Sequence, residues 1–285
     1  MADHEGYPGP DGGGRGGGEA EPGHDCAVIA LETALEGGIG RAVALGRAML
    51  HRAQGARLSD LAAGMVDLVE RGLDQREAAL RQWAAEAAVR SGCEGGAAAA
   101  RAARRLAALL SCYGGLRDLW LIDPAGRILA RGGGAGGGAA VPPADQPWFV
   151  AALAGRAASA LAPVAGEDGV LTLPLAAPVW GGDGSVRGGL VAWLDWRGLA
   201  GTVVQRARQR RESGASARCL LLDPDWRVMA ASDGPAADEI FPLAGVDAAG
   251  FYTDDDGVTV GYARGGRGWY GVVAQRPREL MRLAH

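Results

Sequence analysis

A carboxylate among apolar residues is the first feature of this sequence that could hold a small molecule. Asp195 lies in the segment "AWLDW". A buried carboxylate is costly unless a partner neutralises it, and an ammonium group on a small molecule would be such a partner. In a second interpretation, Asp195 caps a helix that begins near Arg197. The sequence leaves both interpretations open.

Two adjacent aromatic residues stand in the segment "DQPWFVAALAGR". The segment predicts a short helix laid over a sheet, with Asp145 as its N-cap and Pro147 in its first turn. Trp148 and Phe149 would lie on the apolar face of this helix. They would either form the aromatic wall of a pocket or serve only as core residues.

Other kinds of chemistry find little support. The cysteines form no CxxC pair and the four histidines are scattered, so neither set has the spacing of metal ligands. A disulfide between Cys93 and Cys112 would need an oxidising compartment. The chain has no G-x-S-x-G motif and no H-E-x-x-H motif. It also has no P-loop, because it contains no lysine. We expect no metal, no cofactor and no enzymatic activity.

The charge and the hydropathy of the chain limit its surroundings. A formal net charge of −4 gives no electrostatic reason to expect nucleic acid as a partner. No stretch approaches the roughly 20 apolar residues that span a bilayer, and the N-terminus does not look like an export signal. On these grounds the sequence predicts a soluble chain, located in the cytoplasm.

One supersecondary unit occurs twice. The segment "LWLIDPAGRILA" returns as "CLLLDPDWRVMAA", so that Asp123 corresponds to Asp223 and Arg127 to Arg227. Each copy predicts a β-hairpin, with two apolar strands joined by an Asp-Pro turn. A repeat of this kind governs the interpretation of the whole chain.

A helical region precedes the first copy. Residues 1–25 are rich in Gly and Pro and predict a disordered tail. Residues 26–112 contain no proline and have a helical composition. Within this region an apolar stripe is expected from four residues, Leu58, Leu61, Met65 and Leu68.

Two sheet-containing modules follow. Residues 113–200 predict a hairpin, the short helix and a second hairpin built from "GVLTLPLAAPVW" and "VRGGLVAWLDW". Residues 201–216 predict a linking helix, residues 217–277 a second and briefer module, and residues 278–285 the start of a C-terminal helix. The expected fold class is α+β.

This order of elements resembles the double Cache sensor family, whose members are relatives of PAS domains. The resemblance covers roughly residues 57–277 and rests on the two Asp-Pro hairpins, "DQPWFVAALAGR", "PLAAPVWGGDGSVRGGLVAWLD" and the closing "GWYGVVA". It implies a long N-terminal helix followed by two PAS-like modules with antiparallel sheets. It also implies that the first module, distal from the membrane in the family, holds a small molecule between its sheet and its helix.

The resemblance also suggests which residues contact that molecule. In family members that bind amino acids, an arginine two places before the tryptophan grips the ligand carboxylate, whereas this chain has Gln146 there. A neutral amide cannot form the bidentate salt bridge, which favours an amine, or an uncharged or different polar ligand. The candidate ligand-binding residues are Trp148, Phe149, Asp195, Gln146, Trp120 and Thr172.

Family members usually face the outside of the cell and pass signals to an output domain. The sequence shows neither a membrane tether nor an output domain, so we expect either a free-standing sensor that acts through a separate signalling protein or a sensor that has lost its anchors. A homodimer through the N-terminal helix is a further expectation. The alternative function is a structural or dimerising scaffold with a collapsed pocket, and an enzyme is less expected.

Overall fold

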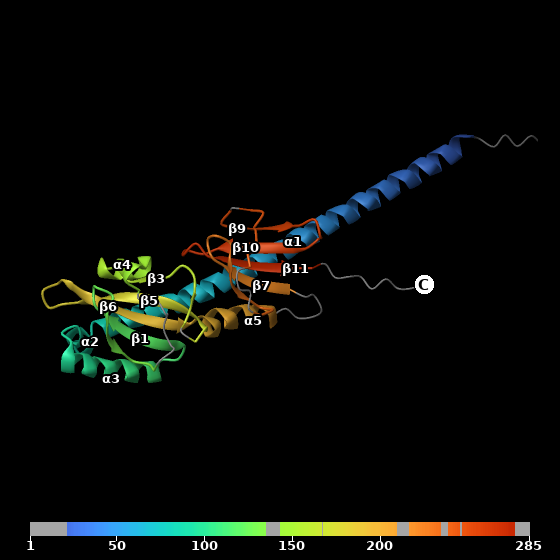
Figure 1. Ribbon diagram of the computed structural model, residues 1–285. Coiled ribbons are helices and arrows are strands. Elements are labelled where there is room, and N and C mark those ends of the chain that lie inside the picture. Colours follow the sequence, from blue (N-terminus) through green and yellow to red (C-terminus); the bar gives the residue numbers. More distant parts are fainter. Residues whose placement is uncertain are drawn as a thin grey trace, which may run out of the picture. The chain divides into compact units, whose positions relative to one another are not determined.

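The structure of the chain, a computed structural model, describes residues 22–134, 143–166, 168–209, 217–234, 239–245 and 247–276. The chain divides into two compact units, Met1–His51 and Arg52–His285, and both sheets belong to the second unit. Most of the predicted tail and the predicted C-terminal helix lie outside the described residues. The predicted α+β class, with a long N-terminal helix and two antiparallel sheets, is confirmed (Figure 1).

The helical region consists of α1 (Pro22–Ala84), α2 (Ala87–Gly92) and α3 (Gly96–Cys112). Helix α1 therefore begins three residues before the end of the predicted tail. The buried stripe of α1 steps by three and four residues, as one helix face requires, through Leu58, Ala62, Met65, Val69 and Leu73.

The prediction that Leu68 belongs to the apolar stripe was wrong. Leu68 is 49% exposed, whereas its neighbour Val69 is fully buried. Successive residues on an α-helix point about 100° apart, so a shift of one position moves a side chain off the buried face. Apolar spacing alone did not decide between these two neighbours.

The first sheet has the strand order β2-β1-β6-β5-β3, with β4 also paired to β5. Helix α4 (Pro147–Leu153) lies on one face of this sheet, and α2 and α3 lie on the other (Figure 1). All strand pairs are antiparallel. The strands are β1 (Leu116–Ile122), β2 (Ile128–Arg131), β3 (Ala158–Ser159), β4 (Val164–Ala165), β5 (Leu171–Trp180) and β6 (Val186–Asp195).

The second sheet follows a single π turn, η2 (Arg197–Gly201), and helix α5 (Thr202–Gln209). Its order is β8-β7-β11-β10-β9. Strand β9 was not predicted, because its sequence follows an irregular segment without a strand pattern. The strands are β7 (Ala217–Leu222), β8 (Val228–Ala231), β9 (Ala249–Thr253), β10 (Thr259–Arg264) and β11 (Tyr270–Gln275).

The two copies of the repeated sequence form the same hydrogen bonds in their Asp-Pro turns. The Asp123 carboxylate accepts bonds from the backbone N–H groups two and four residues later, at 3.0 and 2.8 Å. The Asp223 carboxylate does the same in the second copy, at 2.9 Å for both bonds. This arrangement is an Asx-type turn, in which the side chain replaces a backbone acceptor.

One turn position differs between the copies. Gly126 has a φ of +84°, and the corresponding Trp226 has a φ of +64°. A left-handed conformation costs a residue with a Cβ about 1–2 kcal/mol. The half-buried Trp226 side chain packs against the second core, which offsets part of that cost.

Helix α1 lies unusually close to the second sheet. A Cβ atom added to Gly271 would lie 2.2 Å from the carbonyl oxygen of Ala62, and one added to Gly261 would lie 2.4 Å from the carbonyl carbon of Leu58. Both distances are far below van der Waals contact. The backbones of β10 and β11 therefore pack directly against the backbone of α1.

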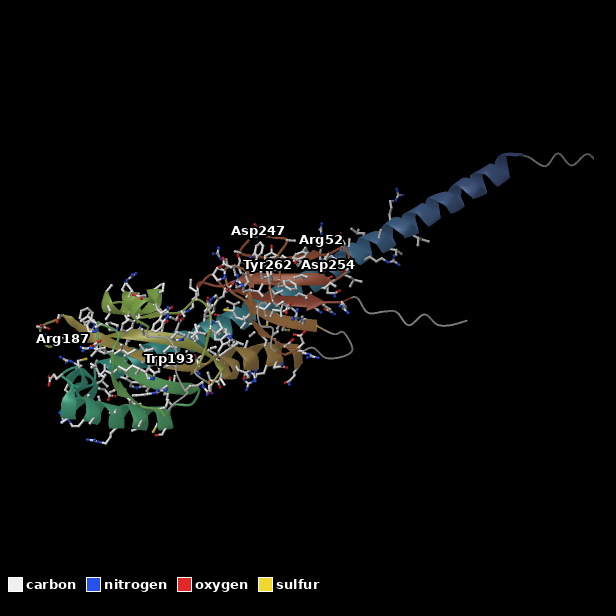
Figure 2. The ribbon with its side chains drawn as sticks, in the orientation of Figure 1. Arg52, Arg187, Trp193, Asp247, Asp254 and Tyr262 are labelled. Carbon is white, nitrogen blue, oxygen red and sulfur yellow. The ribbon has the colours of Figure 1, made fainter. Side chains whose placement is uncertain are left out.

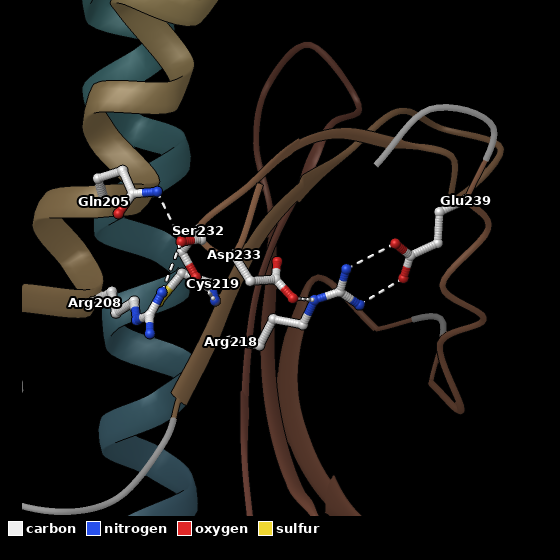
Figure 3. A network of polar contacts seen from close by, with 7 residues as sticks. All are labelled: Gln205, Arg208, Arg218, Cys219, Ser232, Asp233 and Glu239. Atoms are coloured by element: carbon white, nitrogen blue, oxygen red, sulfur yellow. Dashed lines mark hydrogen bonds and ion pairs between the residues drawn. The ribbon is translucent and has the colours of Figure 1, made fainter. Parts of the chain in front are cut away.

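A polar network joins α5 to the second module (Figure 3). Arg218 donates to the two carboxylate oxygens of Glu239 at 2.5 and 2.7 Å and pairs with Asp233 at 2.8 Å. The hydrogen bond from Arg218 lowers the pKa of Glu239. Two side chains of α5 donate to the carbonyl oxygen of Ser232, at 2.7 and 2.9 Å: Gln205 and Arg208.

Candidate functional site

The face of the first sheet that α4 covers carries most of the predicted site residues. Trp193 on β6 lies opposite Asp118 on β1, and Asp195 lies opposite Thr172 on β5. Directly opposed residues share a face, as do alternate residues of one strand. Trp120, two residues after Asp118, therefore lies on this face too.

Helix α4 adds two aromatic rings to the same face. Trp148 is 6% exposed and Phe149 is fully buried. A Cβ atom at Gly189 would lie 2.7 Å from the Phe149 ring, so glycine makes room for that ring on β6. Both predicted aromatics thus face the sheet.

The start of α4 corrects one prediction. Asp145 was expected to be the N-cap, but it ends the 3₁₀ turn η1 (Pro143–Asp145), and Gln146 is the capping residue. Pro147 occupies the first helical position, where its missing N–H costs nothing, and this makes the residue just before it the cap. The Gln146 side chain makes no capping hydrogen bond and is exposed, so the structure does not bring it to the aromatic rings.

Four aromatic rings form one cluster between α4 and the sheet. The centroid of the Trp193 ring lies 4.9 Å from that of Trp120 and 6.0 Å from that of Trp148. Trp148 lies 6.1 Å from Phe149, and all three pairs meet edge to face, an arrangement that aromatic pairs favour. Trp193 was not among the predicted site residues; it lies two residues before Asp195 and hence on the same face of β6.

A buried ion pair borders this cluster. Asp118 is fully buried and accepts four hydrogen bonds, two at each oxygen, from Leu119 N, Trp120 Nε1, Arg131 Nε and Gly133 N at 2.5–2.8 Å. Arg131 also lies over the Trp120 ring, 5.0 Å from its centroid. Four bonds fill the acceptor sites of a carboxylate, so Asp118 has no capacity left for a ligand.

Asp195 takes the capping role that the sequence left open. Its Oδ1 atom accepts a hydrogen bond from Gly198 N at 3.0 Å. Thr172 is also engaged, since its hydroxyl donates to the carbonyl oxygen of Val164 at 3.3 Å. Contact of either residue with a ligand remains a prediction.

A separate cavity of about 550 Å³ opens between α2 and the β5–β6 hairpin. Its arginines are exposed and already bonded: Arg90 donates to the carbonyl oxygen of Trp180, and Arg187 donates to Asp183. Arg187 lies at the outer end of the module, away from Trp193 (Figure 2). The cavity is lined by residues of α2, of the turn that follows it and of the hairpin tip, among them Ser91, Glu94, Trp180 and Gly181.

The cysteines that could have formed a disulfide are free. Cys93 is half-buried and Cys112 is exposed. Burial raises the pKa of the Cys93 thiol, and a thiol with a raised pKa is a poor nucleophile at neutral pH. Cys93 is therefore a poor candidate for a catalytic residue.

Among the helices that the structure describes, none combines the length and the apolar character that a membrane span requires. Within the same residues, no three His, Cys, Asp or Glu side chains are grouped so that they could hold a metal ion.

Solved structures share this arrangement of helix and sheets. The ligand-binding domain of the Pseudomonas fluorescens chemoreceptor CtaA, in complex with L-serine, is 17% identical with a TM-score of 0.55, covering 78% of this chain and 96% of that one. The sensor domain of the V. cholerae histidine kinase DctB is 13% identical with a TM-score of 0.57, covering 80% and 99%. The chain has the double Cache fold.

A third structure with the double Cache fold is the ligand-binding domain of the Pseudomonas aeruginosa amino acid chemoreceptor PctC in complex with GABA. It is 14% identical with a TM-score of 0.57, covering 78% of this chain and 99% of that one. No protein-family model matches the chain, and no curated protein matches it in sequence. The likeness is therefore one of fold.

Proposed function

We propose that this protein is a non-catalytic sensor that binds a small molecule in its first module, between α4 and the sheet, and passes the signal to a partner protein. The observation that carries the proposal is the aromatic cluster of Trp120, Trp148, Phe149 and Trp193 on the sheet face that α4 covers. Aromatic walls with few polar groups are typical of small-molecule sites. The structural neighbours described as ligand-binding and sensor domains support this proposal.

A change at α4 has a short route to the second module. The segment that follows α4 contains Ser159 and Leu161, and both are bonded to the β10–β11 turn. Arg267 Nη1 donates to Ser159 Oγ at 2.8 Å, and Trp269 Nε1 donates to the carbonyl oxygen of Leu161 at 2.6 Å. A ligand that shifts α4 would thus act on this turn.

The same turn is bonded to α1. Arg267 pairs with Asp74 at 2.7 Å and with Glu77 at 2.9 Å, and the Glu70 carboxylate accepts bonds from the backbone N–H groups of Gly266 and Arg267 at 3.0 and 2.7 Å. Burial alone would lower the pKa of Arg267, but the bonds to Glu77 and Asp74 raise it above its ordinary value. Arg267 stays charged and links both modules to α1, the element that would carry the signal.

The N-terminal part of α1 would serve as a homodimer interface in this proposal. Five large apolar side chains there are 47–73% exposed, Ile39, Val43, Leu45, Met49 and Leu50. Covering them with a second copy would remove apolar area from water. Sedimentation of the full chain tests this: we expect a dimer that Leu50→Glu with Met49→Glu converts to a monomer, whereas a wild-type monomer would contradict it.

The binding proposal predicts that Trp148→Ala abolishes ligand binding. Replacing a buried tryptophan costs about 3–5 kcal/mol, a part of the stability of a domain of this size, so the variant should remain folded. A thermal-shift screen of amines, organic acids, purines and amino acids would find a class that raises the wild-type melting temperature, because a ligand of the native state stabilises it. Trp148→Ala should lose that response.

The matched control is Trp180→Ala, which removes a 45% exposed tryptophan from the separate cavity. This variant should respond like the wild type. A response lost in Trp180→Ala and kept in Trp148→Ala would place the ligand in the other cavity. A scaffold would show no response to any class and would keep its partner after Asp195→Ala.

A further inference from the structure

One buried hydrogen-bond donor in the aromatic cluster has no acceptor. Trp193 is 1% exposed, and its Nε1 atom is buried without a hydrogen-bond partner. Buried polar groups are nearly always paired, and an unpaired one lowers the stability of the fold. An isolated buried donor in a native structure therefore calls for an explanation.

Three other buried tryptophans satisfy their indole N–H groups within the protein. Trp120 donates to Asp118 at 2.7 Å, Trp196 donates to the carbonyl oxygen of Met229 at 2.7 Å, and Trp269 donates to the carbonyl oxygen of Leu161 at 2.6 Å. Trp193 differs from these three, and it lies on the sheet face that α4 covers with further aromatic rings.

A water molecule is a poor acceptor for this donor. Buried waters typically make about three hydrogen bonds to protein groups. The rings in contact with Trp193 are those of Trp120 and Trp148, and the Trp120 N–H is already used by Asp118. A molecule with an apolar body and a single acceptor suits such surroundings better.

The fully buried carboxylate beside the cluster is occupied. Asp118 is saturated by four hydrogen bonds, one of them from Arg131. Asp195 is only half-buried, and its Oδ1 atom accepts the hydrogen bond from Gly198. Gln146 is exposed. A ligand ammonium or carboxylate placed against the buried rings would lose its hydration, and Asp118 and Arg131 already pair with each other there.

We propose that the ligand of the first module is an uncharged molecule with an apolar body and one oxygen acceptor, an amide, ketone or alcohol, which accepts a hydrogen bond from Trp193 Nε1. This inference rests on the proposed sensor function and narrows the class of its ligand. Trp193 is the residue that determines specificity for the acceptor.

Compounds of matched size and different charge test the inference. Butanamide, butylamine and butanoate, with benzamide, benzylamine and benzoate as the larger series, are titrated onto the full chain by thermal shift and calorimetry. The amides should bind at least about tenfold more tightly than the charged members. Trp193→Phe, which keeps a ring but removes the donor, should weaken amide binding by about tenfold, the size of one lost hydrogen bond.

The matched control is Trp196→Phe, which alters an equally buried tryptophan whose N–H is bonded to the backbone; amide binding should be unchanged in it. A second measurement needs no substitution in the binding protein: in ¹⁵N-tryptophan NMR spectra of the wild type, the amide should move the Trp193 indole N–H signal most. The Trp193→Phe and Trp196→Phe spectra assign the two signals. If Trp193→Phe fails to fold, nuclear Overhauser contacts of the indole N–H with the rings of Trp120 and Trp148 assign the Trp193 signal in the wild type.

The outcomes separate this inference from the proposed function. Tighter binding of amines, acids or amino acids that Trp148→Ala abolishes would overturn the uncharged-ligand inference and leave the sensor in place. Equal amide binding in wild type and Trp193→Phe, or an unmoved Trp193 signal, would overturn the role of Trp193 alone. The absence of any binding that depends on Trp148 would overturn both.

Discussion

Gly271→Ala is expected to lower the free energy of unfolding by about 3 kcal/mol, because overpacking against an unyielding neighbour lies at the upper end of its usual cost. The added Cβ would meet the carbonyl oxygen of Ala62 at 2.2 Å, and backbone cannot turn aside as a flexible side chain can. For a domain of this size the loss corresponds to about 6–12 °C in melting temperature. Calorimetric or urea-induced unfolding of the full chain measures it.

Gly64→Ala is the control for this prediction. Gly64 lies on α1, the helix that contains Ala62. It is exposed, and no atom lies within 4 Å of a Cβ added there. Alanine at an open helical position stabilises by about 0.5–1 kcal/mol, so the two substitutions should have opposite signs. Equal effects would show that α1 does not press on the second sheet as described.

Arg267→Met is expected to destabilise the protein by about 2–3 kcal/mol and to uncouple its modules. Removing one partner of a fully buried ion pair costs about 3–5 kcal/mol. We expect a smaller loss of stability here because one partner of Arg267, Asp74, is 66% exposed, while the other, Glu77, is 13% exposed. The loss of the bond to Ser159 frees the segment after α4 from the β10–β11 turn. Hydrogen exchange should then rise in residues 158–161 and 265–269.

A surface arginine on α1, the helix to which Arg267 is paired, provides the comparison. Arg71 pairs with Asp67 one turn away, and both side chains are about 60% exposed, so Arg71→Met should change stability by no more than about 0.5 kcal/mol. Its hydrogen exchange should match the wild type. If Arg267→Met behaved like Arg71→Met, the β10–β11 turn would not be the link between the modules.

The local parts of the fold could be predicted because short-range chemistry specifies them. The two Asp-Pro hairpins form as expected, since Asp123 and Asp223 make the turn with their own side chains. The contact of α1 with the second sheet could not be predicted in the same way. It depends on Gly261 and Gly271, which lie about 200 residues from their helix partners and resemble ordinary strand glycines in the sequence.

The candidate site was predicted in part for a related reason. Trp120, Trp148, Phe149, Asp195 and Thr172 all reach the face that α4 covers, because strand alternation and a short amphipathic helix fix their orientation. The hydrogen bonds of each polar group could not be predicted. Only three-dimensional contacts show that the Asp195 carboxylate caps a helix.

Trp193 was missed because its surroundings are as apolar as it is. Within "LVAWLDW" the sequence pattern around Trp193 is that of an ordinary core residue, and only the nearby Asp195 suggests a binding site. The lack of an acceptor for its indole N–H is a property of packing. The period of two along β6, counted back from Asp195, was the one signal that could have found it.

Hydrogen–deuterium exchange on the full chain, with and without the compound that most raises its melting temperature, tests the central claim most directly. The account predicts slower exchange on binding in α4, residues 147–153, and in the part of β6 at residues 189–195. Protection confined to α2 and the tip of the β5–β6 hairpin, or no protection in the first module, would contradict it.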